Sequence, residues 1–130
     1  MNFLETNYLN YIDENLEKIQ KNINNLASEN RNDEANLEKV KANIYNIFKT
    51  LFNVDKNQVK TQKNLNEKET LNLFCTSFLK RFDTIPNNWR SSLENAKNNG
   101  DTLNQVIEET KLAVADKLKD KFIEISKISY

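Results

Sequence analysis

The chain has 130 residues, enough for one domain that buries a hydrophobic core without a metal ion or a disulfide. It contains one glycine and one proline, which argues against β-rich and βαβ folds, because their many turns depend on these two residues. Nineteen basic and nineteen acidic residues give a net charge of zero, and a charged fraction of 29% fits helices with one face in water. The composition therefore predicts an all-α protein.

The balanced charge also argues against nucleic acid as a partner, because binding through phosphates normally needs an excess of basic residues. Lys56, Lys60 and Lys63 would share one helix face, but they bring few charges and no arginine. The first residues include no basic segment followed by an apolar run, and no stretch reaches the roughly 18 apolar residues of a membrane span. We therefore expect a cytoplasmic protein without a membrane contact.

Residues 1–54 carry two apolar stripes with heptad spacing, which predict an antiparallel helical hairpin. The first stripe consists of Leu9, Ile12, Leu16, Ile19, Ile23 and Leu26, and the second of Leu37, Val40, Ile44, Ile47, Leu51 and Val54, with Phe48 and Phe52 widening its face. The stretch 27–36 between them is polar, and Asn32 or Asp33 can cap the second helix.

Residues 55–69 form a link with only Val59 and Leu65 as apolar residues. They are either a loop or a poorly buried helical extension. Structureless loops longer than about 12–15 residues are uncommon in compact domains, so we expect a mobile or partly helical segment.

The second half, residues 70–130, carries two further stripes. The third helix has Leu71, Phe74, Cys75, Phe78, Leu79 and Phe82 on one face, and the last helix has Leu103, Ile107, Val114, Leu118, Phe122 and Ile125, with Val106 and Ala113 alongside. Asp101 is a good N-cap for this last helix.

The proline and the glycine bracket a short helix between these two. Pro86 cannot continue a preceding helix but suits the first turn of a new one, so the third helix should end near Asp83. Gly100 suits the left-handed position just after a helix. The sequence thus predicts a short extra helix at about 86–98, within one four-helix-bundle-like, antiparallel domain that spans residues 1–130.

Trp89 lies on the inner face of the short helix, with Leu93 and Ala96, and two roles are open for it. A tryptophan at core spacing usually anchors its helix to the core, here against Phe82 and the last helix. It can also belong to a protein interface, because tryptophan and arginine are enriched at binding hot spots. The candidate interaction residues are then Lys80, Arg81, Trp89 and Arg90.

Catalytic and metal-binding chemistry finds little support in the residue types. The chain has no histidine, so histidine bases and imidazole metal sites are excluded. Cys75 lies among phenylalanines, where cysteine acts as a small hydrophobic residue. The carboxylate pairs Asp13 with Glu17 and Glu108 with Glu109 are typical of a solvated helix face. We predict that the protein is not an enzyme and binds no cofactor. We also predict that it has no catalytic, cofactor-binding or metal-binding residue.

The sequence favours a non-enzymatic protein–protein interaction module that contacts a protein partner or forms a homo-oligomer, such as a dimer. A bundle that binds a metal through carboxylates, or a small ligand, is the alternative. An immunity-type cytoplasmic protein is another, by analogy with small helical bundles that protect bacteria from bacteriocins, although no shared motif supports it.

Overall fold

A computed structural model describes the backbone of residues 1–129 and the side chains of residues 1–127. Five α-helices make up this part of the chain, and it contains no strand. The helices are α1 (Asn2–Ser28), α2 (Asn32–Lys60), α3 (Glu67–Thr84), α4 (Asn87–Asn98) and α5 (Thr102–Ser129). The all-α bundle and its short extra helix α4 are therefore confirmed.

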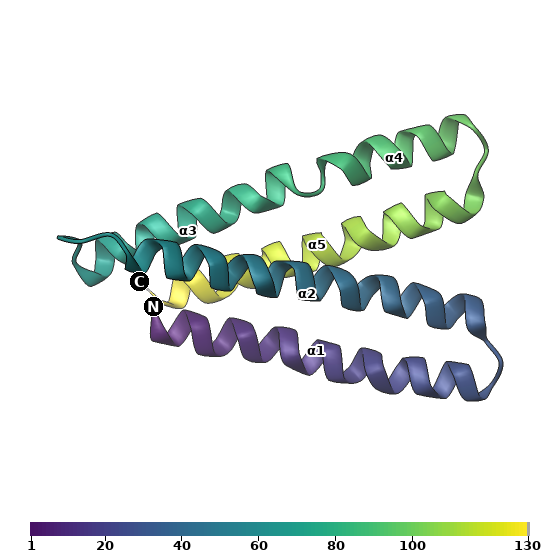
Figure 1. Cartoon of the computed structure of the whole chain (residues 1–130), viewed down its shortest axis with the longest axis horizontal. Coiled ribbons are helices and arrows are strands. Elements are labelled where there is room, and N and C mark those ends of the chain that lie inside the picture. The colour runs from purple at the N-terminus through teal and green to yellow at the C-terminus, as the bar shows by residue number, and fades with distance from the viewer. Residues whose placement is uncertain (130) are drawn as a thin grey trace.

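The helices form two antiparallel arms that meet along α5 (Figure 1). The first arm is the hairpin of α1 and α2, and in the second arm α3 and α4 follow one another while α5 returns beside them. Helix α2 packs on both α3 and α5, whereas α4 packs mainly on α5. The tips of the two arms, 29–31 and 99–101, lie at the same end of the molecule, where the arms diverge, and Met1 lies at the opposite end.

A cluster of aromatic rings near the end opposite the tips forms the centre of the core. Neighbouring ring centroids lie 4.6–6.5 Å apart, in both stacked and edge-on arrangements. The rings are those of Tyr8, Phe48, Phe52, Phe74, Phe78, Phe82 and Phe122. The Tyr8 hydroxyl donates a hydrogen bond to the carbonyl oxygen of Leu118 at 2.9 Å, so this buried polar group is satisfied. The cluster ties α1, α2, α3 and α5 to one another.

The second predicted stripe is only partly buried. Ile47 and Val54 expose 38% and 46% of their surface, whereas Phe48 and Phe52 are fully buried. Helix α2 is therefore rotated about its axis relative to the predicted orientation. Burying the large rings of phenylalanine removes more apolar surface from water than burying isoleucine or valine.

The prediction that the apolar face of the last helix begins at Leu103 is wrong for a different reason. Leu103 and Val106 expose 67% and 44% of their surface, and the buried residue in this turn is Glu108. These residues lie near the tip of the second arm, where the two arms diverge.

The connection between α2 and α3 is shorter than the predicted link, because α2 continues to Lys60. Residues 61–66 join the two helices, and Asn64 has a positive φ of 71°. Helix α3 then begins with a capping box between Asn66 and Glu69, whose backbone N–H donates to the Asn66 side chain at 2.8 Å.

The predicted cap of α2 is wrong, because neither Asn32 nor Asp33 accepts a capping hydrogen bond. A tight turn closes α1 instead: Asn30 has a φ of 59°, and the backbone N–H of Arg31 donates to the carbonyl oxygen of Leu26 at 2.9 Å. This turn makes Arg31 the N-cap residue and places Asn32 and Asp33 in the first turn.

The predicted bracket around α4 is confirmed. Helix α3 ends at Thr84, α4 begins directly after Pro86, and Gly100 has a φ of 66°. The backbone N–H of Asp101 donates to the carbonyl oxygen of Ala96 at 2.8 Å, which closes the end of α4. The Asp101 side chain then accepts from the backbone N–H of Asn104 at 3.2 Å, as an N-cap does.

Gly100→Ala should lower the free energy of unfolding by about 1 kcal/mol, because alanine adopts this left-handed backbone only under strain. No atom lies within 4 Å of the added Cβ, so the loss should come from the backbone alone. Urea denaturation measures it. Gly100→Asn is the control and should lose less, since asparagine tolerates a positive φ. Stabilisation by alanine would contradict the left-handed turn.

Stability should fall above about pH 10 because of the buried hydroxyl of Tyr8. Burial raises the pKa of the Tyr8 hydroxyl well above its usual value of 10.0. The unfolded chain therefore loses this proton at lower pH than the folded chain, and the stabilisation present below pH 10 is lost progressively as the pH rises. Tyr8 alone should lower the free energy of unfolding by about 1.4 kcal/mol per pH unit in this range. Urea denaturation from pH 9 to about 11.5 should show a shallower decline for Tyr8→Phe than for the wild type; equal slopes would contradict the prediction.

Candidate functional site

The four candidate interaction residues do not form one surface group. The Trp89 side chain is half-buried and packs against the core cluster, while Arg90 and Lys80 are exposed. Arg90 donates to the side-chain oxygen of Asn87 at 2.8 Å and to the carbonyl oxygen of Asp83 on α3 at 3.4 Å, so it is held across the junction of α3 and α4. The contact of Trp89 with the core supports its role as an anchor for α4.

Arg81 is held in an internal ion pair. Its guanidinium donates two hydrogen bonds, of 2.8 and 3.2 Å, to the carboxylate of Asp55 on α2. Asp55 is only 3% exposed, and this hydrogen bonding raises the pKa of Arg81 above its usual value. The pair links α2 to α3, so Arg81 has a structural role within the domain.

Arg81→Met should lower the free energy of unfolding by about 3–5 kcal/mol, because it leaves the Asp55 carboxylate buried without its partner. Chemical denaturation measures the loss. Lys80→Met is the control on the neighbouring exposed position and should change stability by less than about 0.5 kcal/mol. A small loss for both variants would show that the pair contributes little to the fold.

The first candidate surface is an apolar stripe on the outer side of α2, which we call the α2 patch. Ile47, Leu51 and Val54 lie at spacings of four and three, so they share one helix face. Ile47 and Leu51 line a shallow depression with Asn43, Asn46 and Thr50. The patch therefore combines exposed apolar side chains with an uncharged polar border.

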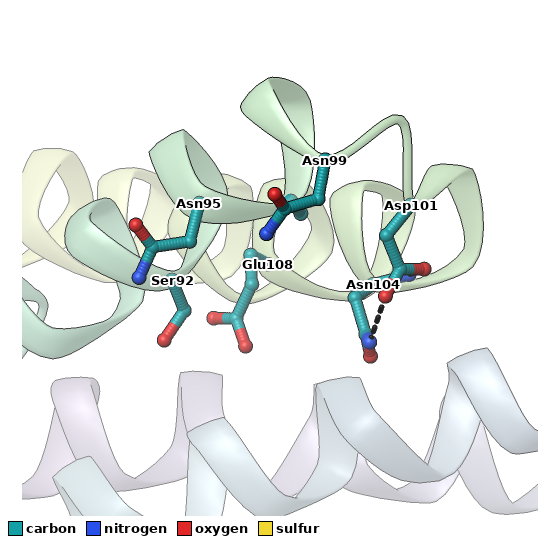
Figure 2. A pocket seen from close by; sticks show the side chains of 7 residues that line it. Ser92, Asn95, Asn99, Asp101, Asn104 and Glu108 are labelled. Carbon is teal, nitrogen blue, oxygen red and sulfur yellow. Dashed lines mark hydrogen bonds between the residues drawn. The ribbon is translucent and has the colours of Figure 1, made fainter.

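The second candidate site is a polar pocket of about 340 Å³ between α4 and α5, which we call the α4–α5 pocket. Its lining residues are Ser92, Asn95, Ala96, Asn99, Asp101, Asn104 and Glu108. In Figure 2 the side chains of Ser92 and Glu108, which both line the pocket, extend toward α1 and α2. Asn104 donates from its side-chain amide to Asp101 at 2.6 Å, shown as a dashed line.

Glu108 is the unusual residue of this pocket, because it is a carboxylate that exposes only 9% of its surface. One oxygen, Oε1, accepts from the Lys111 ammonium at 3.1 Å. The other oxygen, Oε2, is buried and has no hydrogen-bond partner. Buried charged oxygens normally have partners, so this one marks the pocket as a place where a donor is missing.

The expectation of a solvated face is therefore wrong for Glu108, although Glu109 beside it is exposed. A sequence signal for this burial exists: Glu108 precedes Ala115 and Phe122 by seven and fourteen residues, and both are buried. The other carboxylate pair is exposed, and Asp13 forms an ion pair of 2.6 Å with Lys49.

Metal-binding and membrane-spanning features were searched among the described residues. No group of three or more carboxylate, cysteine or histidine side chains in this part of the chain could hold a metal ion. No helix within residues 1–129 is both long and apolar enough to span a membrane. Cys75 is buried in the core cluster.

Comparisons of the chain with protein families, with curated proteins and with solved structures found no match. The α2 patch and the α4–α5 pocket are therefore interpreted from their own chemistry.

Proposed function

We propose that this protein is a non-enzymatic interaction module that associates with a second copy of itself through the α2 patch. The observation that carries the proposal is the exposure of Ile47 and Val54 in one stripe on the outer side of a long helix. Apolar side chains that form a continuous stripe on a surface favour contact with another protein.

The chemistry of the patch suits a second copy. In a two-fold symmetric dimer each patch meets the same patch of its partner, so like charges within it would repel. The depression around Ile47 and Leu51 is bordered by Asn43, Asn46 and Thr50, none of which is charged. Two antiparallel α2 helices can therefore pack through this face without opposing like charges.

Two features support the non-enzymatic part of the proposal. The chain has no histidine, and its one cysteine is buried in the core, where it is shielded from substrates. A cytoplasmic location is part of the same proposal, because a buried lone cysteine needs no oxidising compartment.

The wild-type chain should form a dimer at micromolar concentrations, because the stripe is short and the interface correspondingly small. Size-exclusion chromatography with light scattering measures the mass. Val54→Glu places a charge on the stripe, which would be buried against the apolar stripe of the partner, and it should shift the equilibrium towards monomer at least about tenfold.

Val106→Glu is the matched control, since Val106 is a similarly exposed valine on α5, outside the patch. It should leave the dimer unchanged. A wild-type chain that stays monomeric up to a few hundred micromolar, or equal weakening by both variants, would overturn the proposed self-association.

A further inference from the structure

The α4–α5 pocket contains an acceptor that the protein itself does not satisfy. Among the described residues, Oε2 of Glu108 is the buried side-chain oxygen without a hydrogen-bond donor, although Oε1 of the same carboxylate has Lys111. Removing a carboxylate oxygen from water without a donor is unfavourable. A bound group that donates a hydrogen bond at this position would relieve the cost.

The charge of the pocket indicates a cation. Two of its lining residues, Asp101 and Glu108, are carboxylates, and none is lysine or arginine. Lys111, outside the lining, offsets one of these two negative charges through Oε1 of Glu108, so one negative charge remains. The pocket lies where α4 ends and α5 begins, so the opposite ends of two helix dipoles meet there and largely offset each other. The side chains therefore determine the sign of the electrostatic potential in the pocket, and they favour a positively charged ligand.

Further polar groups around the pocket are already oriented. Asn104 donates both its backbone N–H and its side-chain amide to the Asp101 carboxylate, at 3.2 and 2.6 Å. This arrangement fixes Asp101 and leaves the side-chain carbonyl oxygen of Asn104 as an acceptor. Ser92 and Asn95 add neutral polar groups on the α4 side.

The size and composition of the pocket favour an organic cation over a metal ion. A volume of about 340 Å³ is within the range of small-molecule pockets, and it exceeds what a bare ion needs. Its two carboxylates do not belong to a group of three or more metal-binding side chains among the described residues. An ammonium or guanidinium group carries a charge and several N–H donors, which matches a carboxylate with one free oxygen.

We propose that the α4–α5 pocket binds a small organic cation through an alkylammonium or guanidinium group that donates to Oε2 of Glu108. The cation is either a free amine or the side chain of a lysine or arginine in a peptide. This site lies on different helices from the α2 patch and does not depend on self-association.

The test is a titration of the ¹⁵N-labelled full chain, followed by NMR. Putrescine is the probe for a free amine, and blocked single-residue lysine and arginine amides are the probes for a peptide side chain. At least one of them should shift the side-chain amide signals of Asn95, Asn99 and Asn104 in a saturable way, and the tighter probe identifies the source. 1,4-Butanediol, which has the length of putrescine without its charge, should cause no such shifts.

Variants then locate the charge that is responsible. Glu108→Gln keeps the shape of the side chain but removes its charge, and it should weaken binding of the tightest probe at least about tenfold. Glu109→Gln makes the same change in net charge on the exposed neighbour and should alter binding less than about twofold. Asp101→Asn keeps a capping residue and should weaken binding by a smaller factor than Glu108→Gln.

Three results would overturn the proposal. One is the absence of saturable shifts with all three cationic probes up to 20 mM, while circular dichroism shows a folded chain. Another is equal weakening by Glu108→Gln and Glu109→Gln, which would indicate general attraction to an acidic surface. The third is the same pattern of shifts with magnesium chloride at equal ionic strength, since the pocket would then accept a metal ion.

Discussion

Packing of the aromatic rings is the interaction on which the rest of the structure depends. Tyr8, Phe52, Phe78 and Phe122 come from four different helices and touch one another, so one cluster holds both arms together. Such rings remove large apolar areas from water and add favourable edge-on contacts. The rotation of α2 follows from this packing, because its phenylalanines take the inward positions. The same rotation leaves the α2 patch exposed.

The concentration of the rings near one end also explains why the tips of the arms are polar. Helix α4 packs mainly on α5, and its buried face offers only small or half-buried side chains such as Ala96 and Trp89. With little apolar surface to bury there, Glu108 can occupy an inward position that Ala115 and Phe122 occupy further along the same helix. The α4–α5 pocket therefore lies where the hydrophobic core ends.

The presence of the helices and their order along the chain could be predicted from the sequence, because apolar periodicity and the scarcity of glycine and proline are local signals. The left-handed conformation of Gly100 and the helix cap at Asp101 could also be predicted from local signals. The orientation of each helix about its axis could not be predicted as well, since it depends on partners distant in sequence. Ile47 and Phe48 both fit a stripe, and only contact with Phe78 and Phe82 of α3 decides between them. The burial of Glu108 depends in the same way on packing at the end of an arm.

The dependence of α4 on α5 has a consequence for how the molecule opens. An element that packs mainly on one neighbour can detach at a lower free energy than one enclosed by several, so opening of the second arm need not disturb the aromatic cluster. The break between α3 and α4 at Ile85 and Pro86 also separates their backbone hydrogen bonds, so fraying of one helix need not propagate into the other. The protein therefore combines a stable end with an end that opens more readily. Any occupant of the α4–α5 pocket would bridge two helices at the second end and so protect their amides against hydrogen exchange.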